Sequence, residues 1–306
     1  MMKTKSLVNA AMMMAIYLVF LTLYNIGIFP EIIMFLLPIP IIVYSLVSRK
    51  TIDVVWLLVG CSIGSYLIGS IFGLMTTFLY GGTGAILGIG MMRKWPYWNR
   101  ILNAAILFLI GMPLITLITT GINLSDMFLN IMNEVFSMFG QFEGTLPQGA
   151  SDQLDSMQKM MQTFIPMIMP TGLILMGGFN AFVSDKIACV VLKRMQLEVP
   201  KQQALSEFQL GSKLAIILMI SQLAIVFISN HGLSVILLNI VFLLNALFMV
   251  QGAIVAIQFF KSRNQNGFGI LVVVFAFLSN LSMFVSLVGM MDALFDYRER
   301  FAVKES

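Results

Sequence analysis

The sequence predicts an all-α protein whose helices cross a lipid bilayer several times. Of its 306 residues, 59% are hydrophobic and 10% are charged, and the mean hydropathy is +0.94. Soluble domains average roughly 45–50% apolar and about 25% charged residues. Apolar runs of about 20 residues, the length that spans a bilayer, recur along the whole chain. Together these observations exclude a soluble globular enzyme, a disordered chain and a secreted disulfide scaffold.

Nine apolar runs are predicted to form transmembrane helices. They lie near residues 7–28, 32–48, 54–73, 75–92, 101–121, 164–190, 213–230, 234–259 and 268–291. The first run has no small-residue cleavage site, so we expect a retained helix and not a signal peptide. Residues 1–192 form a six-span domain in this scheme, and 193–306 form a cytoplasmic loop with three further spans. An even number of spans, with a cytoplasmic C-terminal tail, is the alternative.

The distribution of charge predicts how the chain is oriented. Most Lys and Arg residues lie before the first span and after the second, fourth, sixth and eighth. The positive-inside rule then places the N-terminus in the cytoplasm. In a soluble chain the net charge of +4 would suggest nucleic acid as a partner. Here we expect the lipid bilayer as the surroundings and no nucleic-acid partner.

Two connections are too long to be simple turns. In 122–163, apolar residues recur at helical spacing on either side of a break at Gly140, Gly144, Pro147 and Gly149. We therefore expect two amphipathic helices on the outer membrane face, serving as a lid over a cavity or simply completing the bundle. The connection 193–212 is cytoplasmic in this scheme. It is a solvated loop or a docking surface for a partner.

Uncharged polar residues in the outer halves of the spans are the candidate binding groups, because each is costly in hydrocarbon unless it faces the interior. Their hydroxyls, amides and rings suit a small, uncharged or amphiphilic ligand. The competing interpretation is hydrogen bonding between helices, worth about 0.6 kcal/mol per bond. The predicted substrate-binding residues are Tyr24, Asn25, Tyr66, Thr77, Tyr80 and Thr120.

Small residues are arranged in helical rows that allow close packing of helices in lipid. Gly60 and Gly64 form one GxxxG step, and Gly69 and Gly73 form another. Ala11 and Ala15 form AxxxA on the first span, near the predicted cytoplasmic side. We therefore predict that these two alanines face another membrane protein.

The sequence supports no enzymatic activity, metal site or cofactor. It has no HExxH or Walker motif, so energised work would need a partner. Gly60-Cys61-Ser62-Ile63-Gly64 matches the letters GxSxG, but it lies inside an apolar run and not at the strand-to-helix turn that this motif requires. Gly82 to Gly88 mimics a dinucleotide loop but lies between apolar runs. Cys61 and Cys189 show no ligand spacing and are expected to be structural thiols. The abundant methionines could ligate copper through their thioethers, but flexible core packing is the favoured interpretation.

The stretch from Gly289 to Arg300 resembles the C-terminal pattern of the YybS-like (DUF2232) family of bacterial integral membrane proteins. Gln251-Gly252 and the loop from Pro200 to Phe208 also resemble that family, although Gln209–Gly211 departs from its usual Trp and Pro. The resemblance covers the chain in span order and implies a bacterial cell membrane. It implies no particular activity.

The N-terminal half is similar in layout to the substrate-binding (S) components of energy-coupling factor transporters. In that group an AxxxA on the first helix packs on a transmembrane coupling protein that works with ATPase subunits. Ala11 and Ala15 match that motif. The resemblance implies a transport component for a small molecule, energised by these partners. The alternative is a non-transporting membrane scaffold or accessory protein.

Overall fold

A computed structural model describes residues 4–140, 150–199, 203–228, 230–265, 267–279 and 281–298. These residues form α-helices joined by turns and short irregular segments, and none of them lies in a strand. Among them, six helical segments are long and apolar enough to cross a membrane, and three shorter apolar helices accompany these. The predicted fold class, a multi-pass bundle of membrane helices, is confirmed. The chain divides into two compact units, Met1–Lys201 and Gln202–Ser306.

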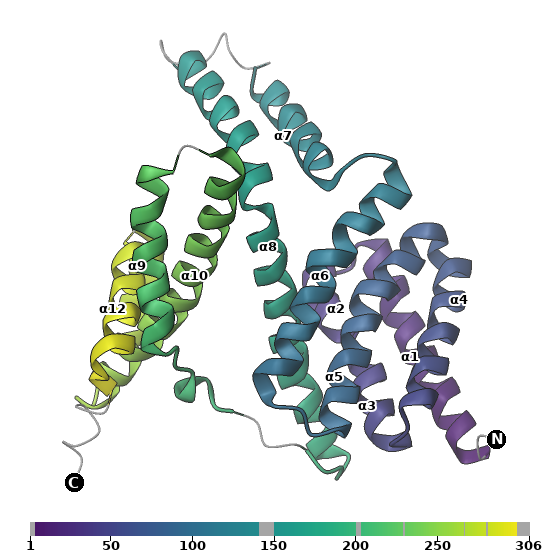
Figure 1. Cartoon of the computed structure of the whole chain (residues 1–306). Coiled ribbons are helices and arrows are strands. Elements are labelled where there is room, and N and C mark those ends of the chain that lie inside the picture. Colours follow the sequence, from purple (N-terminus) through teal and green to yellow (C-terminus); the bar gives the residue numbers. More distant parts are fainter. Residues whose placement is uncertain are drawn as a thin grey trace. The chain divides into compact units, whose positions relative to one another are not determined.

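The first unit contains most of the helices labelled in Figure 1. Their bounds are α1 Thr4–Ile26, α2 Pro30–Leu36, α3 Ile39–Ser48, α4 Thr51–Thr76, η1 Thr77–Gly81, α5 Gly82–Met92, α6 Tyr97–Thr120, α7 Leu124–Gly140 and α8 Ala150–Arg194. The predicted second span is thus two helices, α2 and α3. The break lies at Leu37 and Pro38, because proline has no N–H to donate to the preceding turn.

The chain reverses direction inside α4, at Ser70. This residue has φ 56° and ψ −148°, a conformation that is strained for any residue except glycine. Beyond it, a Cβ on Gly73 would overlap the backbone carbonyl of Ser65, and the Ser65 and Thr77 hydroxyls lie 2.5 Å apart. In a straight helix these two hydroxyls would be roughly 18 Å apart along the axis. Residues 51–92 therefore pass through the bundle twice, and the reversal lies a few residues before the predicted one at 73–75.

Helix α8 replaces two elements that the sequence predicts as separate. We expected a surface helix ending near residue 163 and a span at 164–190, but α8 is continuous over 45 residues. Its length is about 68 Å, more than the 40–45 Å of a bilayer with its headgroups. Pro166 and Pro170 remove two hydrogen bonds without ending the helix, because the remaining turns keep theirs.

Helix α7 packs beside the first part of α8, so the predicted insertion 122–163 forms a helical hairpin with it (Figure 1). The side-chain amides of Gln158 and Gln162 on α8 both donate to Asn133 Oδ1 on α7, each over 3.0 Å. The predicted break between the two helices, at Gly144, Pro147 and Gly149, lies outside the described residues.

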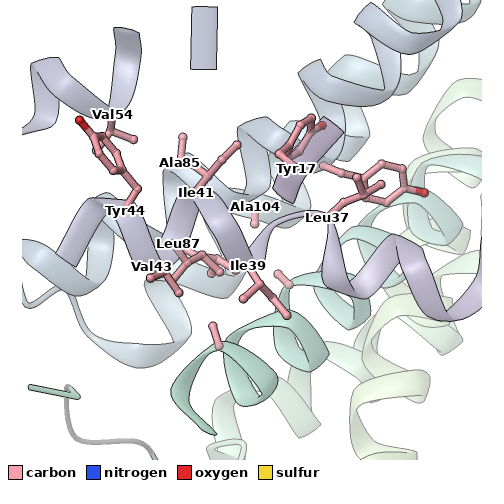
Figure 2. Packing of buried hydrophobic residues seen from close by; sticks show 14 of the residues in the cluster. Tyr17, Leu37, Ile39, Ile41, Val43, Tyr44, Val54, Ala85, Leu87 and Ala104 are labelled. Atoms are coloured by element: carbon pink, nitrogen blue, oxygen red, sulfur yellow. The ribbon is translucent and has the colours of Figure 1, made fainter. Parts of the chain in front are cut away.

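The core of the first unit is made by α1 and α3 to α6, with α8 against them. Tyr17, Leu37 and Ile41 are fully buried, and Figure 2 shows them with other members of the cluster. Glycines let α5 approach α3 closely, since a Cβ on Gly88 would overlap Ser45. The glycine rows in this half of the chain therefore serve close helix packing, as their helical spacing predicts.

In the second unit the described residues form four α-helices and one short 3₁₀ turn. Their bounds are η3 Leu205–Glu207, α9 Ser212–Phe227, α10 His231–Lys261, α11 Phe268–Leu278 and α12 Ser282–Phe295. Two of them, α11 and α12, occupy the predicted ninth span 268–291. The helix is broken between them, where Ser279 and Leu281 have ψ angles near +15° in place of helical ones.

The predicted ninth span is therefore not one continuous helix. Helix α11 starts against the last turns of α10, because a Cβ on Gly269 would lie 3.0 Å from Ile257 Cα. Helix α12 then runs parallel to α10, with Asn245 bonded to Ser286 at 3.0 Å and Gln251 to Asp292 at 2.8 Å. The chain thus leaves α12 at the end of the unit where α10 finished (Figure 1). This geometry favours the even count of crossings.

Candidate functional site

The predicted binding residues in the middle of the first unit are tied to one another. Thr77 is fully buried, its hydroxyl accepts from Tyr17 over 3.0 Å, and it lies 2.5 Å from Ser65 Oγ. The Tyr24 and Tyr80 rings pack with centroids 5.9 Å apart. These hydrogen bonds and ring contacts join α1, α4 and η1. They use the polar groups that a ligand would otherwise meet.

The other predicted binding residues lie apart from this network. The Tyr66 side chain is 54% exposed, and the exposed Thr120 donates its hydroxyl to the Thr116 carbonyl of its own helix over 2.7 Å. Asn25 lines an open groove of about 400 Å³ between α1 and α4. The groove's lining residues are Thr22, Asn25, Ile26, Ile68, Gly69 and Phe72. The structure therefore brings Tyr24 and Tyr80 together, but not all six residues around one cavity.

A second cavity lies between α6, the start of α7 and α8. Its volume is about 420 Å³ and it is open on one side. Three prolines inside helices contribute to its wall: Pro113 on α6, and Pro166 and Pro170 on α8. The remaining lining residues are Leu109, Leu114, Leu117, Asn123, Leu124, Ser125, Met169 and Leu173.

The lining of this cavity can be compared with that of small-molecule sites in general. Its wall is mainly aliphatic, with a thioether, one amide and one hydroxyl, and no ionisable side chain among its lining residues. The Ser125 hydroxyl lies 3.6 Å from Met169 Sδ. Small-molecule sites are typically cavities of about 300–1,000 Å³ with mostly apolar walls and a few polar groups. The cavity fits that description, and its lining offers no acid, base or nucleophile for catalysis beyond one serine.

Sequence reasoning missed this cavity because it followed hydroxyls and rings in place of prolines. A proline inside an apolar run was the available signal. Interrupted hydrophobic segments often mark binding sites in transporters, since the irregular backbone lines a cavity. Pro113, Pro166 and Pro170 are all visible in the sequence within or beside predicted spans.

The predicted partner-facing residues lie on the surface of the first unit. Ala11 and Ala15 are both exposed on α1. Large apolar side chains accompany them, with Val8 62% and Met12 49% exposed. This face of α1 is thus available to lipid or to another membrane protein.

A buried ion pair joins α6 and α8 away from the cavity. Arg100 Nη2 lies 3.3 Å from Asp185 Oδ1, and the two side chains are 1% and 0% exposed. The Arg100 guanidinium also lies 5.4 Å from the centre of the Tyr97 ring. Charges within a membrane bundle are tolerated when they pair in its interior. This pair links the first turn of α6 to the C-terminal part of α8.

In the second unit, a buried carboxylate organises one end of the bundle. Asp292 is fully buried on α12 and accepts from Arg298 Nε and from Gln251 on α10, both over 2.8 Å. Gln251 in turn accepts from the backbone N–H of Leu210, and Arg298 donates to the Ser206 carbonyl over 3.1 Å. Two helices and the 203–210 loop are thereby fastened together.

Beside this cluster, α10 and α12 touch through their backbones. A Cβ on Gly252 would overlap the Val285 carbonyl, and a Cβ on Gly289 would overlap the Phe248 carbonyl. The short motifs Gln251-Gly252 and Gly289 to Arg298, which are 30 or more residues apart in sequence, therefore meet at one crossing. Their spacing serves packing and charge pairing in this unit.

Metal binding finds no support in the described part of the chain. No group of three or more His, Cys, Asp or Glu side chains there is arranged to hold an ion. Cys61 and Cys189 are both buried, and they form no disulfide with each other.

Comparison with known proteins places these features in a family. The family model described as "Predicted membrane protein (DUF2232)" matches residues 13–293, from α1 to α12. The chain is 21% identical to the uncharacterized protein YybS of Bacillus subtilis (strain 168) over 313 residues, which covers 98% of this chain and 99% of that protein. No solved structure matches.

Proposed function

The chain belongs to the DUF2232 family of predicted membrane proteins, and from this starting point we propose that it captures a small, uncharged or amphiphilic molecule for transport. The binding site in this proposal is the cavity between α6, α7 and α8. Partner subunits with ATPase activity supply the energy, because the chain contains no Walker motif of its own.

The observation that carries this proposal is the cavity itself. It has a volume of about 420 Å³, walls that are mostly apolar, and no ionisable lining residue. Such a site rejects ions, since a charge within it would have no partner. It accepts molecules with an apolar body, since these gain contact with Leu117, Leu173 and Met169.

The cavity opens on the extracytoplasmic side in this proposal. It lies toward the end of α6 near Gly121 and next to the α7–α8 hairpin. The basic residues Arg49, Arg93 and Arg194 lie at the C-terminal ends of α3, α5 and α8, on the side of the unit away from the cavity. The positive-inside rule therefore favours a cytoplasmic N-terminus and an outward-facing cavity. Labelling Ser137→Cys and Lys94→Cys variants with an impermeant maleimide in intact cells tests this, and only Ser137→Cys should react.

A cavity-filling variant tests the binding function. Trp at Leu117, which lines the cavity, should displace any small molecule that co-purifies with the protein. Trp at Ile118, the next residue and 67% exposed outside the cavity, is the matched control. Native mass spectrometry from mild detergent reads out the bound molecule. Equal occupancy in both variants, or an empty wild-type protein after repeated attempts with cell extract, would contradict the proposal.

The partner interface in this proposal is the exposed face around Ala11 and Ala15. Ala11→Leu and Ala15→Leu should reduce co-purification of a coupling protein and ATPase subunits, since larger side chains block close helix approach. Val190→Leu, at a 54% exposed position of α8, is the control. Unchanged recovery in all three variants counts against this interface.

A non-transporting scaffold or accessory protein is the second candidate. The hydrogen bonds among Tyr17, Ser65 and Thr77 favour it, because they use polar groups that a larger binding site would present to a ligand. This alternative predicts that Leu117→Trp changes no bound molecule, while partner recovery still depends on the α1 face.

A further inference from the structure

Two residues in the wall of the α6–α8 cavity, Leu109 and Pro166, have backbone carbonyls that cannot form the usual helical hydrogen bond. In an α-helix the carbonyl of one residue accepts from the N–H four residues later. Four residues after Leu109 stands Pro113, and four residues after Pro166 stands Pro170. A proline nitrogen carries no hydrogen, so neither carbonyl can receive this bond. All four residues line the cavity.

Each of these carbonyls must find another donor or stay unpaired. An unsatisfied backbone carbonyl is costly in a membrane, where no bulk water replaces the missing bond. The other polar groups of the wall are the side chains of Asn123 and Ser125. The Ser125 hydroxyl lies 3.6 Å from the Met169 sulfur on α8, within the same wall. The wall thus combines the residues that carry these carbonyls with a mostly aliphatic surface.

We infer that the cavity selects uncharged molecules with an O–H or N–H donor on an apolar body. The donor binds the Leu109 or Pro166 carbonyl, and the apolar part contacts the aliphatic wall. A ligand that carries only acceptors would leave these carbonyls unsatisfied, and an ion would enter without a counter-charge. This inference rests on the proposed binding function and names the ligand class of the same site.

Two matched probes test the donor requirement. A trifluoromethyl-substituted benzyl alcohol carries one O–H, and its methyl ether has nearly the same shape without the donor. Fluorine NMR measures how each binds the full chain in lipid nanodiscs, with empty nanodiscs correcting for partition into lipid. We expect the alcohol to bind about fivefold more tightly than the ether, the usual net effect of one hydrogen bond.

Proline substitutions identify the acceptors. In Pro113→Ala the new N–H can bond to the Leu109 carbonyl, and in Pro170→Ala it can bond to the Pro166 carbonyl. Each variant should reduce the ratio of alcohol affinity to ether affinity, because the loss of the ring from the wall acts on both probes and the new N–H competes only with the alcohol. Pro166→Ala is the matched control. It also loses a ring from the wall, but it satisfies the carbonyl of Gln162, which does not line the cavity.

The outcomes separate this inference from the proposed function. If both probes bind equally and Leu117→Trp displaces both, the cavity is a binding site but the donor requirement is wrong. If the preference for the alcohol survives in Pro113→Ala and Pro170→Ala, these carbonyls are not the acceptors and the inference fails. If Leu117→Trp affects neither probe, the cavity binds neither, and the proposed function fails with the inference.

Discussion

The α10–α12 pair of the second unit and the α6–α8 pair of the first are packed in opposite ways. Gly252 and Gly289 let the backbones of α10 and α12 touch. Helices α6 and α8 meet closely at Gly177 and are joined by the Arg100–Asp185 ion pair, but further along they border a cavity of about 420 Å³ with three prolines in its wall. In lipid, helices associate through small residues and polar pairs, because hydrophobic burial no longer distinguishes protein from solvent. Where these are absent, the two helices border a cavity.

Among the changes considered for the two helix pairs, breaking the Arg100–Asp185 ion pair should cause the largest loss of stability. Asp185→Leu leaves the Arg100 charge buried without its partner, and such changes cost about 3–5 kcal/mol of stability. Thermal unfolding in detergent can be followed with a thiol-reactive dye, since Cys61 and Cys189 are buried until the unit opens. Adding Arg100→Met to Asp185→Leu should restore most of the stability. A double variant as unstable as the single one would show that the pair does not hold α6 to α8.

A side chain at the glycine crossing should have the next largest effect. Gly252→Val places atoms against the Val285 carbonyl and should cost about 3 kcal/mol, the upper range for overpacked sites. Circular dichroism during thermal unfolding measures this loss. Gly172→Val on α8 is the control, because a Cβ there meets nothing within 4 Å. Equal losses in both variants would mean that helix propensity, and not the crossing, sets the effect.

The hydroxyl network should contribute less than either. Thr77→Val keeps the shape of the side chain but removes the group that bonds to Tyr17 and lies beside Ser65. A loss of about 1 kcal/mol is expected, since hydrogen bonds between membrane helices are individually weak. The rate at which Cys61 reacts with a maleimide reports the loosening. Thr76→Val, whose hydroxyl bonds only within its own helix, should change little. Identical rates in the two variants would show that the Thr77 hydrogen bonds do not hold η1 against α1 and α4.

The smallest change in stability should come from a variant in the cavity wall, Pro113→Ala. Unlike the variants above, it should not destabilise the protein. Pro113→Ala restores a helical N–H and removes atoms from a wall that already borders empty space. The protein should be at least as stable as the wild type in the same dye assay, because a helix-interior proline is unfavourable by about 3 kcal/mol before compensation. A clear loss of stability would indicate that the ring supports α6 against α8, and that the cavity is less open than the structure shows.

The sequence predicted the class and most crossings because hydropathy and charge act locally along the chain. The described residues of the first unit pass through it six times, as the apolar runs indicate. Helix α8, however, continues through the boundary near residue 163 that the loop pattern predicted. The prediction failed for residues 268–291, where an apolar run long enough for one crossing forms two helices that return to one end. Composition does not distinguish a crossing from a hairpin.

The candidate site shows a similar division. Thr77 and Tyr80 were found from the sequence because polar groups inside apolar runs are conspicuous, but the sequence does not say whether such groups meet a ligand or one another. Here Thr77 bonds to Tyr17, and Tyr80 packs on Tyr24. The cavity was missed because its wall is assembled from ordinary apolar residues and prolines of three helices, which are adjacent only after folding.

The sequence alone determined that this chain is a polytopic membrane protein of the DUF2232 family, since composition, apolar run length and short motifs are properties of the linear chain. Only the tertiary structure decided which polar groups are already paired, where the chain turns back, and where helices leave space. These depend on contacts between residues far apart in sequence. The geometry of those contacts is set by how whole helices pack, which no single segment encodes.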